Sequence, residues 1–187
     1  MFIRSERLFL RPGWPEDWYE IAQQIADRDV ARNLADVPCV NAGREPPVFA
    51  APSSDPRCPH FLVTMPSSLE PARVIGGIGL TDCEGEPELG YWIARQFWGR
   101  GFASEAIRAV LRLARTLGHR QVRAGSFVGN PASAQVLAKT GFSPTGDVRQ
   151  RFSVVNGEAM AFAVHAISLG EPSDCDDDVT DAAMRAA

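Results

Sequence analysis

The sequence predicts one globular α/β domain in which helices and strands alternate along the chain. Its 187 residues match the usual size of a single domain. A content of 45% apolar and 22% charged residues is that of an ordinary water-soluble protein. Segments with the two-residue period of a strand alternate with segments that have the period of a helix. We expect residues 1–170 to form the domain and 171–187 to form an acidic, disordered tail.

Composition and charge exclude several classes of protein. No apolar run approaches the ~18 residues of a membrane span, and the charged first seven residues are unlike a signal peptide. We therefore expect a cytoplasmic protein without membrane contact. The net charge of −4 comes from the tail, which holds six acids and one arginine, so the domain lacks the basic surface of a nucleic-acid-binding protein. The four cysteines include no C-x-x-C pair, and no metal site is expected.

The first 60 residues are expected to contain one strand, two helices and a long loop. Leu8 and Leu10 predict a strand that ends at Pro12. Pro15 begins a helix that runs through Ile25, and a second short helix is expected at 29–34. The prolines between 36 and 59 predict an irregular loop, which we place on the substrate side.

The rest of the domain alternates strands with two helices. The clearest helix carries apolar residues at helical spacing and ends at Gly118, and a hairpin turn is expected at Asn156–Gly157. The remaining expected elements are strands at 61–65, 74–80, 88–94, 121–128, 152–155 and 159–168, a turn at 82–87 and a helix at 131–140.

A glycine-rich turn after the strand at 88–94 is the best candidate for an anion-binding site. Gly99 and Gly101 allow close approach of the backbone, and the following helix directs its free N–H groups to the same place. Ser104 adds a hydroxyl and Arg100 a charge. A dinucleotide fingerprint is excluded because the third glycine and the later acid are missing. Two interpretations remain: a coenzyme A pyrophosphate site, or a structural turn before a solvated basic helix face of Arg108, Arg112 and Arg115.

The residues around this turn resemble the GNAT acetyltransferase superfamily, and more closely its RimJ/RimL-like branch. Gln96, Gly99 and Gly101 match the superfamily signature Q/R-x-x-G-x-G/A. Three longer stretches are similar to motifs of the branch, in the right order: 5–12 with Asp17, 90–106, and 130–142. The resemblance spans about residues 5–168. It implies a mixed, largely antiparallel sheet with helices on both faces and one parallel strand pair that splays apart.

The resemblance implies that acetyl-CoA is the co-substrate and that it binds between the strands at 88–94 and 121–128. Backbone near 92–94 would pair with the pantetheine arm and polarise the acetyl carbonyl. Trp92 and Trp98 are expected to pack in the core more than to stack on ligand, and Asn130 is also expected to cap a helix. The expected cofactor-binding residues are Trp92, Ile93, Ala94, Gln96, Trp98, Gly99, Arg100, Gly101, Phe102, Ala103, Ser104 and Asn130.

Glu88 and Ser133 are the candidate catalytic residues. Glu88 is the candidate base, because a carboxylate beside apolar rings accepts a proton more readily. The alternatives are that Glu88 is the last acid of a polar turn, or that a water relay serves as the base. Ser133 is the candidate donor to the leaving thiolate, and its alternative role is a first-turn residue that serves the helix backbone.

The sequence thus favours an N-acetyltransferase that transfers an acetyl group to a primary amine by direct attack in a ternary complex. The acceptor is either a protein N-terminus or a small-molecule amine, and the enzyme is a monomer or a homodimer. A non-catalytic acyl-CoA-binding sensor is the alternative. Such a sensor would keep 96–104 but would not need Glu88 or Ser133.

Overall fold

A computed structural model describes residues 1–34, 53, 55–66, 72–153 and 155–170. Most of the predicted loop at 36–59 and the whole predicted tail at 171–187 lie outside the described residues. The helices and strands are β1 (Ile3–Arg4), β2 (Phe9–Arg11), η1 (Pro15–Asp17), α1 (Trp18–Ile25), α2 (Arg28–Ala31), β3 (His60–Met65), β4 (Arg73–Cys83), β5 (Glu86–Ile93), η2 (Arg95–Phe97), α3 (Phe102–Thr116), β6 (Gln121–Phe127), α4 (Pro131–Lys139), β7 (Ser143–Ser153) and β8 (Glu158–Ser168).

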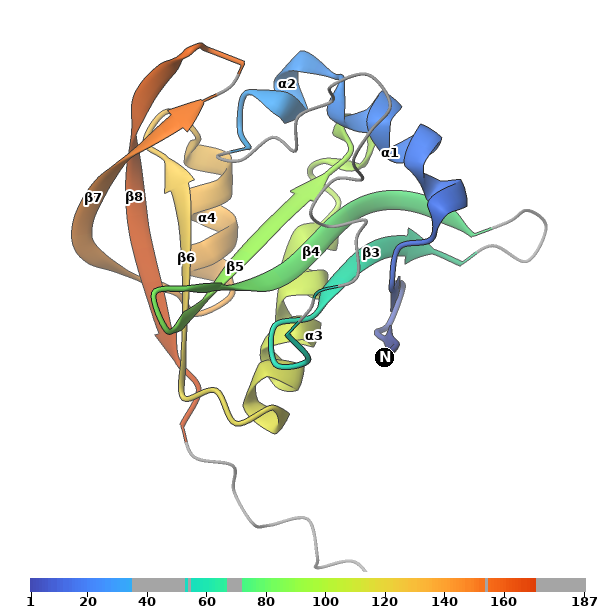
Figure 1. The fold of residues 1–187 in the computed structure, drawn as a ribbon, viewed down its shortest axis with the longest axis horizontal. Helices are drawn as coiled ribbons and strands as arrows, with labels where there is room; N and C mark the ends of the chain where they lie inside the picture. Colours follow the sequence, from blue (N-terminus) through green and yellow to red (C-terminus); the bar gives the residue numbers. More distant parts are fainter. Residues whose placement is uncertain (35–52, 54, 67–71, 154, 171–187) are drawn as a thin grey trace, which may run out of the picture.

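The described strands form one eight-stranded sheet in the order β1-β2-β3-β4-β5-β6-β8-β7. Neighbouring strands are antiparallel except for β5 and β6, which are parallel. In Figure 1, α3 and α4 lie behind the sheet, and α1 and α2 lie nearer the viewer across its upper end. This arrangement confirms the predicted mixed α/β fold with a largely antiparallel sheet.

The parallel pair separates soon after it forms. Only Glu88↔Arg123 and Leu89↔Ala124 are in register, although β5 continues to Ile93 and β6 to Phe127. Figure 1 shows β5 running diagonally away from the upright β6. The splay that the family resemblance implies is therefore present, and it opens toward the carboxyl ends of both strands.

Helix α3 anchors the back of the sheet through its apolar stripe. Ile107, Val110 and Ala114 are fully buried because they recur on one side of the helix. Arg108, Arg112 and Arg115 are exposed, which confirms the solvated basic face. Since the stripe fixes α3 against the sheet, it also fixes the glycine turn that precedes the helix.

A buried ion pair ties β2 to η1. The guanidinium of Arg11 donates to both carboxylate oxygens of Asp17 at 2.6 and 2.7 Å, and Asp17 also accepts from the Trp14 N–H. Burial acts to raise the pKa of Asp17, but the hydrogen bonds from Arg11 and Trp14 outweigh it and lower the pKa. The spacing of Arg11 and Asp17 in the family motif thus serves to hold the N-terminal segment.

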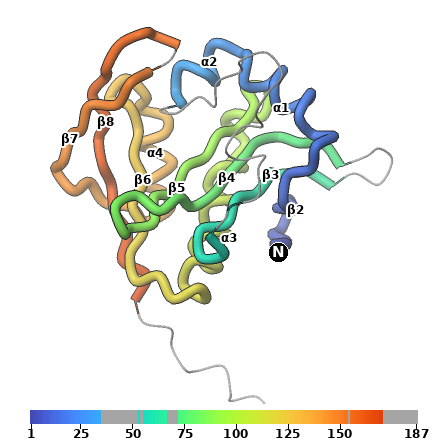
Figure 2. Tube along the Cα trace, in the orientation of Figure 1, coloured from blue at the N-terminus to red at the C-terminus, as the bar shows by residue number. Residues whose placement is uncertain are grey.

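The largest difference from the sequence prediction is β7. We expected a strand at 152–155, whereas β7 begins at Ser143 and ends at Ser153. Most of its residues are exposed, and its register is interrupted between Pro144 and Val148, so the apolar alternation of a half-buried strand is missing. Figure 2 shows β7 and β8 as a long curved hairpin at one side of the molecule.

Smaller differences concern element ends. The strand expected at 88–94 starts earlier, at Glu86, because the turn tightens around Glu84 and Gly85, both with positive φ. The second helix is shorter than expected, over Arg28–Ala31. Strand β1 was not predicted, since it has only two residues. No helix among the described residues is long and apolar enough to cross a membrane.

Candidate active site

The splay leaves backbone groups of β5 directed toward β6 without a strand partner. The Ala94 N–H donates to the Ile75 carbonyl of β4 at 2.9 Å. Because alternate residues of an antiparallel strand face the same neighbour, the amides of Tyr91 and Ile93 face the other way, into the gap. Register with β6 ends at Leu89, so β6 does not cover them. This edge can accept an extended ligand arm as an added strand.

The glycine turn behind the gap lies where the sequence predicted it, directly before α3. Gly99 has φ of +72° and Gly101 of +78°, a region that residues with a Cβ rarely adopt. Gly101 is the N-cap of α3, and among the described residues no side chain caps that helix. The first N–H groups of α3 are therefore available to an anion.

Glu105 joins this turn to the N-terminal segment. Its carboxylate accepts hydrogen bonds from Ser5 Oγ at 2.8 Å, from the Arg7 backbone N–H at 2.7 Å and from Arg7 Nε at 2.8 Å. Burial acts to raise the pKa of Glu105, but these hydrogen bonds outweigh it and lower the pKa. Arg7 Nη1 also donates to the Arg100 carbonyl, so the opening motif supports the glycine turn.

A tyrosine that the sequence analysis missed lies across the gap from α4. The Tyr91 hydroxyl is 2.8 Å from Ser133 Oγ, and the Ser133 N–H donates to the Asn130 side chain at 3.1 Å. Asn130 is thus a helix N-cap, as predicted. Burial raises the pKa of Tyr91, although the hydrogen bond with Ser133 acts in the opposite direction. The phenol is therefore protonated at neutral pH and can donate a proton.

Glu88 lies on the opposite face of β5 from Tyr91, because successive side chains alternate. Both its carboxylate oxygens contact Nη2 of Arg151, at 2.7 and 2.8 Å. The Arg151 guanidinium lies over the Phe162 ring, 4.7 Å from its centroid. Glu88 is thus an ion-paired carboxylate at the base of the gap, and Arg151 is a partner that the sequence analysis did not identify.

The remaining predicted residues differ in environment. Trp92 is buried, as expected, and its indole Nε1 has no hydrogen-bond partner among the described residues. Trp98 is not a core residue, because it is 44% exposed. Its indole N–H donates to the Ile93 carbonyl at 2.6 Å and so holds the end of β5. Ser104 is buried in the first turn of α3.

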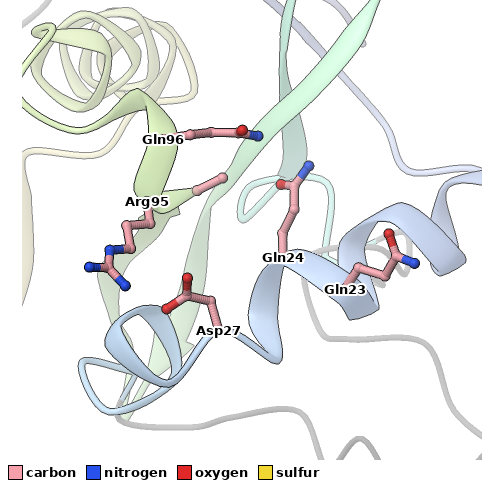
Figure 3. A pocket seen from close by; sticks show the side chains of 6 residues that line it. Gln23, Gln24, Asp27, Arg95 and Gln96 are labelled. Carbon is pink, nitrogen blue, oxygen red and sulfur yellow. The ribbon is translucent and has the colours of Figure 1, made fainter.

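A polar pocket of about 240 Å³ lies beside the predicted signature, between α1 and the end of β5. In Figure 3, Gln96 extends across it toward Gln24 of α1, and Asp27 points into it from below. Arg95 pairs with Asp29 at 2.8 Å, which ties this corner to α2. Gln96 thus faces α1, and its contact with the coenzyme stays a prediction.

Comparison with known proteins decides the family. A model of the acetyltransferase (GNAT) domain matches residues 7–143. The chain belongs to the GNAT acetyltransferase family. A curated relative from Bacillus subtilis (strain 168), the uncharacterized N-acetyltransferase YoaA, is 32% identical over 169 residues, covering 88% of this chain and 95% of the relative. This GNAT protein is therefore an acetyl-CoA-dependent acetyltransferase.

Solved structures of acetyltransferases share the fold at low sequence identity. Spermidine N-acetyltransferase from Vibrio cholerae, in complex with CoA and spermine, has a TM-score of 0.66 and 19% identity, covering 87% of this chain and 96% of that one. RimL, a ribosomal L7/L12 alpha-N-protein acetyltransferase in complex with coenzyme A, has a TM-score of 0.67 and 16% identity, covering 90% and 98%. For this GNAT protein, these similarities show only the fold.

Proposed function

We propose that this GNAT protein is a RimJ/RimL-like N-acetyltransferase that acetylates a primary amine in a ternary complex with acetyl-CoA. The observation that best supports this proposal is that the pairing of β5 with β6 ends at Leu89. It leaves the amides of Tyr91 and Ile93 directed into a gap. A gap without a turn for phosphates would be only a sheet irregularity. Here the glycine turn lies between β5 and α3, and no side chain of the described residues caps that helix.

The described residues fit acetyl-CoA as co-substrate. The free backbone edge of β5 would hold its extended arm, with Ile93 and its neighbours Trp92 and Ala94 as the contact segment. The turn from Trp98 through Gly101 and the first turn of α3 would hold its pyrophosphate, and Arg100 would add a positive charge. When bound, acetyl-CoA supplies the thioester that the amine attacks.

Tyr91 and Ser133 form the best-placed pair to deliver a proton to the departing thiolate. Tyr91 is protonated at neutral pH because burial raises its pKa, and Ser133 Oγ lies at hydrogen-bond distance from it. Ser133 in turn is held at the start of α4 by Asn130. The pair is therefore oriented at both ends, as a general acid requires.

Glu88 is the proposed proton acceptor for the amine, directly or through water. Its position on the opposite face from Tyr91 separates the acid from the base by one strand. The ion pair with Arg151 orients the carboxylate. A protein α-amine, with pKa about 7.7–8.0, needs only such a modest base.

The test is amine-dependent release of the coenzyme A thiol from acetyl-CoA. Purified protein is assayed against N-terminal peptides, amino acids, polyamines and aminoglycosides, and the acetylated amine is identified by mass spectrometry. We expect at least one acceptor to give stoichiometric thiol release and acetylation. Tight binding of acetyl-CoA without release on any acceptor would instead support the non-catalytic acyl-CoA sensor.

A further inference from the structure

On the face of the sheet that carries Glu88, strands β6 and β7 contribute three arginines. Arg123 lies beside Glu88 in the register of β5 and β6, and Arg149 and Arg151 lie on one side of β7 because they are two residues apart. Arg123 pairs with Glu86, and Arg151 pairs with Glu88. Two of the three cations are thus neutralised within the protein.

Arg149, the third of these arginines, has no acidic partner among the described residues. It lies opposite Phe162 in the β7–β8 register and is only partly exposed. The nearest acids along the hairpin are Asp147, two residues before Arg149 in β7, and Glu158 at the start of β8; both are exposed, and neither forms an ion pair with Arg149. A partly buried cation without a counter-charge is a favourable site for an anion.

A second hydrogen-bond donor on this face, the indole N–H of Trp92, also lacks a partner among the described residues. Trp92 shares the Glu88 face of β5 because four residues separate them. It is only 4% exposed. Gly90 lies between them and has no side chain, so no side chain of β5 separates Trp92 from Glu88 on this face. Because the indole nitrogen is buried, the unpaired donor on this face that a ligand can reach is the partly exposed Arg149, and a ligand for it must carry an anion.

We propose that the acceptor amine also carries a carboxylate or similar oxyanion, which Arg149 binds while the amine lies near Glu88. This inference rests on the proposed function. It disfavours a polyamine, because a second ammonium would meet Arg149 without compensation. The anion can belong to a free amino acid or to an acidic residue near a peptide N-terminus, since both present the same carboxylate.

The test compares matched acceptors that differ only in charge. The first pair is an amino acid and its carboxamide; the second is a tetrapeptide with Asp at position two and its Asn counterpart; spermidine is the cationic reference. We expect kcat/KM to be at least about tenfold higher for the anionic member of one pair, since a hydrogen bond to a charged group has this magnitude. The pair that shows the difference identifies the source of the carboxylate.

Variants then assign the effect to Arg149. Arg149→Gln should reduce the preference to less than about twofold, chiefly through KM, and Arg149→Lys should restore part of it. Arg112→Gln removes one exposed arginine of α3 and should leave the preference unchanged. Circular dichroism and acetyl-CoA affinity confirm that each variant is folded.

Three outcomes would overturn the inference. Equal kcat/KM within both pairs, or a preference for spermidine, would show that the acceptor needs no anion. An anionic preference that persists in Arg149→Gln would show that another group binds it. Absence of thiol release with every acceptor would overturn the proposed function and this inference with it, so the two failures are distinguishable.

Discussion

The Tyr91 hydroxyl lies 2.8 Å from Ser133 Oγ, and this contact joins β5 to α4 beside the point where β5 and β6 separate. Tyr91 comes from the strand that offers free backbone groups, and Ser133 comes from the first turn of the helix that follows β6. A pair of hydroxyl groups thus links β5 to α4, the helix that follows β6.

Removal of the Tyr91 hydroxyl should slow acetyl transfer without weakening acetyl-CoA binding. We expect Tyr91→Phe to lower kcat on the order of 10²-fold, as for loss of a general acid. Ser133→Ala should lower kcat by about tenfold, because one hydrogen bond to Tyr91 is lost. Stopped-time thiol assays measure kcat, and calorimetry measures affinity.

The other tyrosine of the chain supplies the control. Tyr19 on α1 is 73% exposed, and Tyr19→Phe should leave both kcat and affinity unchanged. In neither Tyr91→Phe nor Ser133→Ala should a rise in pH restore the rate, since the missing proton goes to the thiolate. Wild-type kcat in Tyr91→Phe would remove the pair from the chemistry.

Substitution of Glu88 distinguishes a catalytic base from a carboxylate with a structural role. Glu88→Gln keeps the shape and should lower turnover by about 10²–10⁴-fold, as for loss of a general base. The loss should shrink as pH rises, because more of the amine is then already neutral. A pH–rate profile on the best acceptor measures this.

Glu86 provides the matched control for Glu88, because its carboxylate also pairs with an arginine of the same face, Arg123. Glu86→Gln should leave the pH–rate profile as in the wild type. If Glu88→Gln also keeps wild-type turnover near neutral pH, Glu88 is only a partner of Arg151, and a water chain serves as the base.

The buried Arg11–Asp17 pair should contribute strongly to stability. Asp17→Asn leaves the guanidinium of Arg11 buried without a counter-charge, and we expect a loss of roughly 3–5 kcal/mol in the free energy of unfolding. Because the pKa of Asp17 is lowered in the folded state, its contribution is complete above the ordinary aspartate pKa of about 3.9. It is lost as pH falls through the lower folded value.

Urea unfolding at pH 7 and at acidic pH tests this account. Asp29→Asn is the control, because Asp29 pairs with the exposed side chains of Arg32 and Arg95, and exposed pairs contribute about 0–1 kcal/mol. Equal effects of the two substitutions at pH 7 would contradict the role assigned to Asp17.

The sequence predicted the elements whose burial is periodic and missed those whose burial is not. Helix α3 was predicted because Ile107, Val110 and Ala114 repeat at helical spacing. The first part of β7 was missed because exposed residues carry no such pattern, and the Pro144–Val148 irregularity breaks its register. Local sequence also fixed the glycine turn, since positive φ at Gly99 and Gly101 needs that residue type.

The partners of the site residues could not be predicted because they are distant in the chain. Glu105 and Arg7 are separated by 98 positions, Glu88 and Arg151 by 63, and Tyr91 and Ser133 by 42. Contacts of this kind depend on how the sheet folds, which periodicity does not specify. The motif similarity marked Ser133 and Arg7 but did not show which side chains they meet.

Acetyl-CoA affinity of Gly101→Val tests the central claim most directly, namely that the turn behind the β5–β6 gap holds the coenzyme. Gly118→Val is the matched control, because Gly118 has φ of +84° at the far end of α3 and none of the described residues has an atom within 4 Å of where its Cβ would be. Both substitutions strain a left-handed residue, but only Gly101 borders the proposed site. We predict that Gly101→Val abolishes binding measured by calorimetry while Gly118→Val keeps it. A folded Gly101→Val protein whose affinity changes by less than about threefold, under 1 kcal/mol, would contradict the account.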